Sequence, residues 1–222
     1  GHKTLEQEEQ PLDQFSGQTM RIVGISIVRW QHKDASITEP VVLCSAYDLN
    51  HFGYFQRGSV KEMATFFTRT CVKKTQPGAY QRLEHEGQFC YVVCKASGIT
   101  GTLIADNEYP QRVAFSLLNR LLEDFSTKFG GQWNQGKADN CMDFPDLEAA
   151  LQKFQDPQEA DKIMKIQKDL DETKEILYNT IDQVLDRGQK LDDLIEKSDD
   201  LSMQSKHFYK TAKKHNQCCK AY

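Results

Sequence analysis

The longer, N-terminal part of the chain alternates between short apolar runs and longer amphipathic stretches. Apolar and β-branched runs at 21–30 and 40–49 predict two strands, and similar runs near 79–86, 88–97 and 101–108 predict three more. After the second run, and again after the fifth, apolar residues recur with the 3.6-residue spacing of a helix. The pattern therefore predicts the order ββαβββαα, an α+β fold in which helices cover both faces of one sheet.

The predicted helices carry their own start signals. Ser59 and Glu62 have the spacing of a capping box, so we expect the first helix to begin near Val60. Pro110 suits the first turn of the second helix. A third, shorter helix is expected around 145–155, where apolar residues fall on one face. These elements fill a domain over 20–155.

Beyond Pro157 the pattern becomes that of a coiled coil. Steps of three and four residues from Ile163 to His215 give sixteen positions, of which ten are apolar and four are Ser or Thr. Residues 158–217 hold no Pro and one Gly, so we expect one helix over 157–217, with about 80 Å of it in this register. The seam positions other than Arg187 and His215 are Ile163, Ile166, Leu170, Thr173, Leu177, Thr180, Val184, Leu191, Leu194, Ser198, Leu201, Ser205, Phe208 and Ala212.

Arg187 lies on this seam, midway between apolar residues. A cation on a face that a coiled coil buries is costly unless a partner hydrogen-bonds it. In a homo-oligomer, each copy would bring the same charge to the same layer, and the Ser and Thr layers would bury little apolar area. Unlike helices can instead supply neutral oxygen acceptors for the guanidinium and larger side chains opposite the small ones. The spacing therefore predicts a coiled-coil strand built for unlike partners.

Charge and cysteine content exclude several classes of protein. The net charge of −4 gives no basic field that would attract nucleic acid, so no nucleic-acid partner is expected. No apolar run is long enough to span a bilayer. The seven Cys include no C-x-x-C pair, which favours buried thiols in a reducing compartment. Residues 1–19 are polar and without periodicity, and we expect them to be a disordered leader or an artificial extension.

Several stretches together carry a resemblance to a known family. The sequence "LDETKEILYNTIDQVLDRGQKLDDLIEKSDDLSMQSKHFYKTAKK", with Arg187 in mid-seam, resembles the SNARE motif of an R-SNARE. The stretches "SAYDL", "FQRGSVKEM" and "DNEYPQRVAFSLL" resemble a longin domain, and the tail "HNQCCKAY" resembles that of lipid-anchored longin R-SNAREs. The resemblance implies a profilin-like longin domain (a five-stranded antiparallel sheet with helices on both faces) over 20–155, an R-SNARE motif over 157–217 and a lipidated tail at 218–222.

The resemblance also implies a function. Arg187 would occupy the central layer of a parallel four-helix bundle formed with three Q-SNARE helices, which drives vesicle docking and membrane fusion in secretory, ER–Golgi or endosomal transport. The longin domain would fold back onto the SNARE helix in a closed, autoinhibited form, with Met63, Phe66 and Phe67 as the contact surface. The protein would divide between the cytosol and the cytoplasmic face of Golgi, ER, vesicle or endosomal membranes.

The tail departs from the usual prenylation pattern. The last four residues have the CaaX length, but Lys220 stands where an aliphatic residue is usual, and Tyr222 is not a common final residue. We nevertheless expect a prenyl group on Cys219 and a palmitoyl group on Cys218, because stable anchoring needs two signals. The lysines at 206, 210, 213, 214 and 220 would add contacts with anionic headgroups.

Two other classes of function stay open. One is a longin-type adaptor or scaffold whose coiled coil forms homo-oligomers. The other is an S-acyltransferase that acts on its own tail cysteines, which the family alone suggests. Gly131–Lys137 fits G-x-x-x-x-G-K, yet Ala138 replaces the residue that binds Mg²⁺, and the stretch follows a helix rather than a strand. We therefore expect no enzyme, no catalytic or metal site, and no cofactor besides the covalent lipids.

Overall fold

The computed structural model describes residues 21–30, 39–156, 158–160, 162 and 175–219, with the side chains of 215–219 set aside. Four predicted seam residues, Ile163, Ile166, Leu170 and Thr173, lie outside the described residues. The leader at 1–19 and the last three residues of the tail also lie outside them. Below, the α+β domain means residues 21–156, and the C-terminal segment means residues 175–219.

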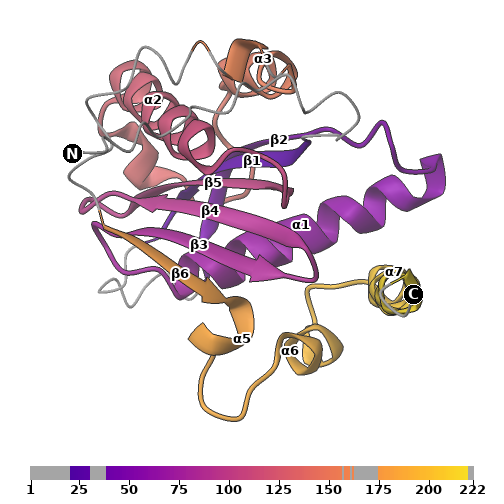
Figure 1. Cartoon of the computed structure of the whole chain (residues 1–222). Coiled ribbons are helices and arrows are strands. Elements are labelled where there is room, and N and C mark those ends of the chain that lie inside the picture. The colour runs from indigo at the N-terminus through magenta and orange to yellow at the C-terminus, as the bar shows by residue number, and fades with distance from the viewer. Residues whose placement is uncertain (1–20, 31–38, 157, 161, 163–174, 220–222) are drawn as a thin grey trace, which may run out of the picture.

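A twisted six-stranded sheet forms the middle layer of the molecule (Figure 1). Its strand order is β2-β1-β5-β4-β3-β6, and every neighbouring pair is antiparallel except β3 and β6, which run parallel. The five strands expected in the α+β domain are confirmed, and the sixth comes from the C-terminal segment. The strands are β1 (Ile22–Arg29), β2 (Val41–Tyr47), β3 (Tyr80–His85), β4 (Gln88–Cys94), β5 (Ile99–Asp106) and β6 (Ile176–Thr180).

Helices cover both faces of the sheet, as the alternation of patterns predicts. Two of them, α2 (Gln111–Phe129) and α3 (Asp146–Lys153), pack on one face around a core that includes Phe115 and Phe125. On the other face lies α1 (Arg57–Lys73), which places Val60, Ala64, Cys71 and Val72 against the sheet. The α+β fold is therefore confirmed. The stretch that matches G-x-x-x-x-G-K forms a short 3₁₀ helix, η3 (Gln132–Gln135), and not a phosphate-binding loop between a strand and a helix.

The start of α1 differs from the prediction. The helix begins at Arg57, directly after the 3₁₀ turn η2 (Tyr54–Gln56), and Ser59 is buried inside it. Glu62 makes no capping box with Ser59, because its carboxylate accepts hydrogen bonds from the C-terminal segment instead. The local pattern could not reveal a partner so distant in the sequence.

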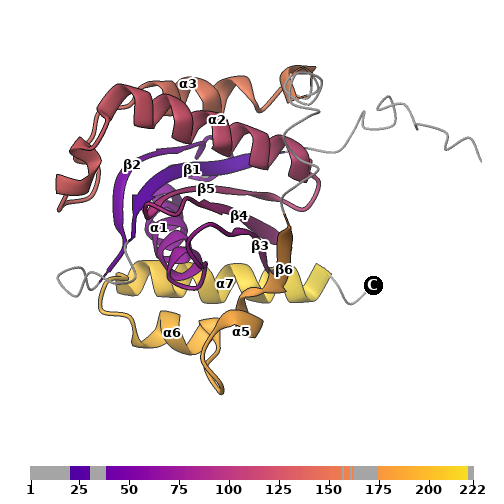
Figure 2. The same ribbon diagram turned by 90° about the vertical axis from the view of Figure 1, so that its left-hand side faces the viewer.

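The C-terminal segment is not the single long helix that the seam predicts. Its described residues run through β6, then α5 (Ile181–Val184), α6 (Leu191–Lys197) and α7 (Met203–Cys219). Figure 2 shows these helices on the side of α1 opposite to α2 and α3. The physical reason is that an amphipathic helix draws most of its stability from the surface that covers its apolar face. In the chain alone, that surface is α1 and the edge of β3.

Candidate functional site

The first part of the site is the sheet edge where β6 lies beside β3. The two strands pair in parallel over Tyr80–Glu84 and Ile176–Thr180. Tyr178 adds a side-chain contact, since the guanidinium of Arg82 lies 4.9 Å from its ring centroid and 4.6 Å from that of Phe89. Gln111 Nε2 donates a hydrogen bond of 2.7 Å to Tyr178 Oη. A cation–π contact of this kind contributes about 0.5–1 kcal/mol at an exposed site. The strand is therefore held by side chains as well as by its backbone ladder.

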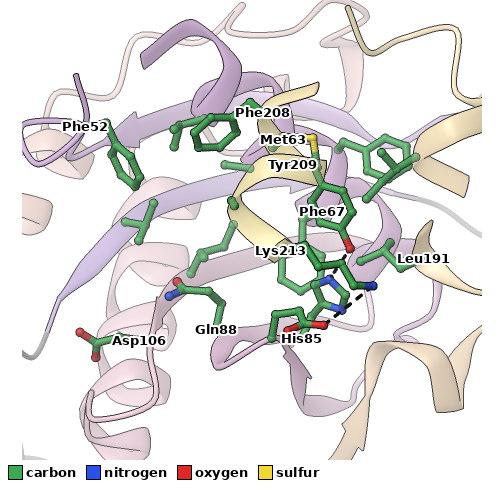
Figure 3. Close-up of a pocket in the computed structure, with 18 of the residues that line it drawn as sticks. Phe52, Met63, Phe67, His85, Gln88, Asp106, Leu191, Phe208, Tyr209 and Lys213 are labelled. Carbon is green, nitrogen blue, oxygen red and sulfur yellow. Dashed lines mark hydrogen bonds and ion pairs between the residues drawn. The ribbon is translucent and has the colours of Figure 1, made fainter. Parts of the chain in front are cut away.

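The second part is an apolar pocket between α1 and the helices that fold over it (Figure 3). The three α1 residues expected at this surface, Met63, Phe66 and Phe67, all line the pocket and are half-buried. The pocket has a volume of about 400 Å³, which lies within the range of ligand sites in proteins. From the C-terminal segment, the lining residues are Leu191, Ile195, Phe208, Tyr209, Ala212 and Lys213.

The third part is a polar contact at the start of α7. Ser202 N and Ser205 Oγ donate to the same Glu62 oxygen, at 3.0 and 2.7 Å. The hydrogen bond from Ser205, followed by those from Ser202, lowers the pKa of the Glu62 carboxyl. Ser202 Oγ also accepts from Ser205 N and so caps α7. Glu62, which the sequence places in a capping box of α1, therefore helps to cap the start of α7 instead.

The fourth part is a hydrogen-bonded network that joins β3 to α6 and α7. Tyr209 Oη donates to Asp192 Oδ1 at 2.6 Å, so its single proton is used, and His85 Nε2 donates to Tyr209 Oη at 2.8 Å. Lys213 forms ion pairs with Asp192 and, at 3.9 Å, with Glu86. Figure 3 shows Lys213 beside His85 and Tyr209. This network joins the α+β domain to both α6 and α7 of the C-terminal segment.

Burial and nearby charge set the pKa values of this network. Burial lowers the pKa of His85, and Lys213 acts in the same direction, although the carboxylates of Glu86, Asp182 and Asp192 oppose the shift. Burial alone would raise the pKa of Asp192, but its hydrogen bonds from Lys213 and Tyr209 outweigh it, and that pKa is lowered. The arrangement therefore favours a neutral imidazole beside an ionised carboxylate.

The structure does not bring the predicted seam together as one face. Arg187, Leu177 and Thr180 are exposed. Among the seam residues whose burial the structure describes, Val184, Leu194, Ser198, Phe208 and Ala212 are half-buried, and Leu191, Leu201 and Ser205 are buried. Arg187 lies in a turn, where Gln189 N donates to Asp186 O at 2.9 Å. The free chain therefore buries only part of the stripe that a coiled coil would bury.

Sequence reasoning missed several residues of this site, both the polar ones of the network and others inside the C-terminal segment. Ile181, Leu185 and Ile195 are buried against the α+β domain but lie off the seam. Gly188, the one glycine between 158 and 217, has a φ of +84° in the turn beside Arg187. Its position was the available signal, because an isolated glycine in a helical pattern usually has a structural reason.

The tail is placed only in part. Cys218 and Cys219 end α7, and the position of their side chains is not described. Within the part of the chain that is described, no helix is both long and apolar enough to cross a bilayer.

Comparison with known proteins identifies both halves of the chain. A family model described as a regulated-SNARE-like (longin) domain matches residues 49–151, and a synaptobrevin model matches residues 162–221. The chain is 45% identical over 201 residues to "Synaptobrevin homolog ykt6" of Schizosaccharomyces pombe, which spans 90% of this chain and 98% of that protein. It is 50% identical over 182 residues to "VAMP-like protein YKT61" of Arabidopsis thaliana, spanning 82% of this chain and 91% of that one.

The alignments with these relatives span 82–90% of the chain, and the two family models match residues in both the α+β domain and the C-terminal segment. Both family models describe SNARE-related domains, and the two relatives are named as a synaptobrevin homologue and a VAMP-like protein. A synaptobrevin-type motif acts in a complex with other SNARE proteins. The chain therefore belongs to the longin-domain R-SNAREs, the synaptobrevin homologues that work in vesicle trafficking.

Proposed function

We propose that the C-terminal segment exchanges between two partners: the longin domain of its own chain and three Q-SNARE helices. In the second state, residues 157–217 form one helix of a parallel four-helix bundle that zips from Ile163 toward Ala212 and draws two membranes together. Arg187 lies in the central layer, where glutamine oxygens accept its hydrogen bonds. The single observation that supports this exchange is that the free chain leaves Arg187, Leu177 and Thr180 exposed, although the seam demands their burial.

The longin domain, over 20–155, holds the closed form. Met63, Phe66 and Phe67 line the pocket between α1 and the C-terminal segment, and Glu62 and His85 bond to it. While these contacts persist, Leu191, Leu201 and Ser205 are buried and cannot enter a bundle. Closure therefore inhibits assembly by competing for the same segment.

The pocket also suits the lipid that the tail is expected to carry. Its lining is mainly apolar, and α7 contributes Phe208 and Ala212 to it. Cys219 is seven residues beyond Ala212, which is about 10 Å along a helix. A prenyl group on Cys219 can fold back over this distance and lie in the pocket, which would keep the closed form off the bilayer. On opening, prenyl and palmitoyl groups on Cys219 and Cys218 anchor residues 218–222 to the cytoplasmic face of Golgi, ER, vesicle or endosomal membranes.

The test of the bundle is to mix the purified chain with recombinant Qa-, Qb- and Qc-SNARE helices of one Golgi set. We expect an SDS-resistant complex with one copy of each helix and a gain in helix content. The Arg187→Leu variant should lose the fixed alignment of the four helices, because the layer no longer requires three glutamines. Homo-oligomers of the chain alone, with no response to the Q-SNARE helices, would favour the scaffold alternative.

The test of the anchor is the intact mass of the protein from its own cells. A mass that carries one prenyl and one acyl group supports the anchor, and two free thiols at 218 and 219 rule it out. An acyl-CoA assay with the purified protein separates the remaining alternative, since a binding protein shows no turnover.

A further inference from the structure

The C-terminal segment carries apolar and aromatic side chains that its seam does not use. If Ile163 starts a heptad at position a, then Tyr178 and Leu185 fall at b, and Ile181, Ile195 and Tyr209 fall at e. We call these five residues the off-register set. Position b points away from the axis of a bundle and position e lies at its margin, so a four-helix bundle leaves these side chains wholly or partly in water.

In the free chain the same five residues contact the longin domain. Ile181 and Ile195 are 1% exposed and Leu185 is 8% exposed, all within the core that α1 shares with the sheet. Tyr178 lies against Arg82 and Gln111, and Tyr209 bonds to His85.

Some seam residues face solvent instead. Leu177 is 43% exposed although it occupies position a, and its neighbour Tyr178, itself 53% exposed, keeps its side-chain contacts with Arg82 and Gln111. The turn at 186–189 also exposes Arg187, while Lys74, directly after α1, pairs with Asp186 at 2.7 Å. Around the central layer, Ile181 and Leu185 are therefore buried against the longin domain while Arg187 is exposed, although the seam residues Val184 and Leu191 pack there too.

We propose that the off-register set is a second interaction surface of the SNARE motif, specific for the chain's own longin domain. The two partners then use overlapping sets of residues of one segment. The described seam residues Leu191, Leu201 and Ser205 are buried in the closed form and Val184, Leu194, Ser198, Phe208 and Ala212 are half-buried, whereas the off-register set serves the closed form alone. This proposal rests on the proposed function. It explains why a solvent-facing position of the bundle holds a leucine: Leu185 is selected by the closed form and not by the bundle.

Leu185 and Leu177 form a matched pair for the test. Glutamine has a helix propensity close to that of leucine, so neither substitution changes the intrinsic stability of a helix appreciably. Leu185→Gln removes a buried apolar contact from the closed form but leaves a polar residue on the outside of the bundle. Leu177→Gln leaves the exposed site of the closed form almost unchanged but places an amide in an apolar layer of the bundle.

Each full-length variant is measured in two ways. Hydrogen exchange of residues 176–197 and of β3 reports the closed form, with the amides of α2 as the control for folding. The melting temperature of the complex with the Qa-, Qb- and Qc-SNARE helices reports the bundle. For Leu185→Gln we expect exchange at least about 10-fold faster, with a melting temperature within about 2 °C of wild type. For Leu177→Gln we expect exchange near wild type and a melting temperature lower by about 5 °C or more.

Either of two results would overturn the proposal: exchange that Leu185→Gln leaves unchanged, or a bundle that it weakens as much as Leu177→Gln does. Failure of the proposed function is distinct, because the wild-type chain would then form no complex with the three helices at all.

Discussion

Gly188 offers the sharpest single test of the exchange between closed form and bundle. In the closed form its φ of +84° lies in the left-handed region, which costs an L-residue about 1–2 kcal/mol. A Cβ added at Gly188 would meet nothing within 4 Å, so Gly188→Ala adds backbone strain and no steric clash. In a continuous helix the same change is favourable by about 1 kcal/mol, because glycine is a poor helix former.

Both effects disfavour closure relative to the bundle. Together they amount to about 2–3 kcal/mol, or a change of about 30- to 150-fold in the equilibrium between the two states. Hydrogen exchange of residues 176–197 in the free chain should accelerate, since the strain alone opens the closed form about 5- to 30-fold more often. The complex with Q-SNARE helices should melt at a higher temperature than the wild-type complex.

Gly58→Ala is the matched control. Gly58 lies in α1 without a positive φ, and a Cβ there also meets nothing within 4 Å. It should therefore leave both exchange of the C-terminal segment and melting of the bundle near wild type. If Gly188→Ala also left the exchange unchanged, the turn beside Arg187 would not be a feature of the free chain, and the reasoning would fail.

Three further perturbations test the contacts one by one. Phe66→Glu puts a carboxylate at the pocket and should raise the membrane-bound fraction of the cellular protein while the domain stays folded. Tyr54→Glu, at a side chain already 80% exposed, should leave that fraction unchanged. Equal fractions for both variants would argue against the closed form as an inhibitor of membrane binding. Burial in the closed form lowers the pKa of His85 below its ordinary value of 6.5, so the closed form favours the neutral imidazole and should lose stability as the pH falls through about 6.5. Limited proteolysis of the C-terminal segment as a function of pH should show this loss. The His85→Gln variant should not show the pH dependence in that range. Glu62→Gln weakens the charge-assisted hydrogen bond from Ser205, so amides at the start of α7 should exchange about 3 to 10 times faster than in the wild type. An unchanged exchange rate would show that the contact contributes little to the closed form.

Most of the α+β domain could be predicted from the sequence because its signals are local. Strand alternation, the 3.6-residue spacing of α2, and Pro110 and Gly130 at its two ends all act within a few residues of one another. The start of α1 could not be predicted in the same way, since the partners of Glu62 lie in α7. The three α1 residues expected at the contact surface do line the pocket there, and their role in regulation stays a prediction.

The conformation of the C-terminal segment could not be predicted because the seam describes only one of its two partners. A heptad register states what a helix buries against other helices, and it contains no information about the free edge of β3. One local signal pointed to the alternative: "ILYNT" combines β-branched and aromatic residues, and it forms β6. The off-register isoleucines and leucine carry the rest of that information.

The most direct test is hydrogen exchange of β3 and the C-terminal segment before and after addition of the three Q-SNARE helices. In the free chain we expect Tyr80–Glu84 and Ile176–Thr180 to be protected together, because each strand covers the other. When the bundle forms, β3 should exchange faster while 176–213 becomes more protected as a helix. If β3 stayed protected while the chain joined the complex, the C-terminal segment would not be shared between the two partners, and the exchange proposed for this protein would be wrong.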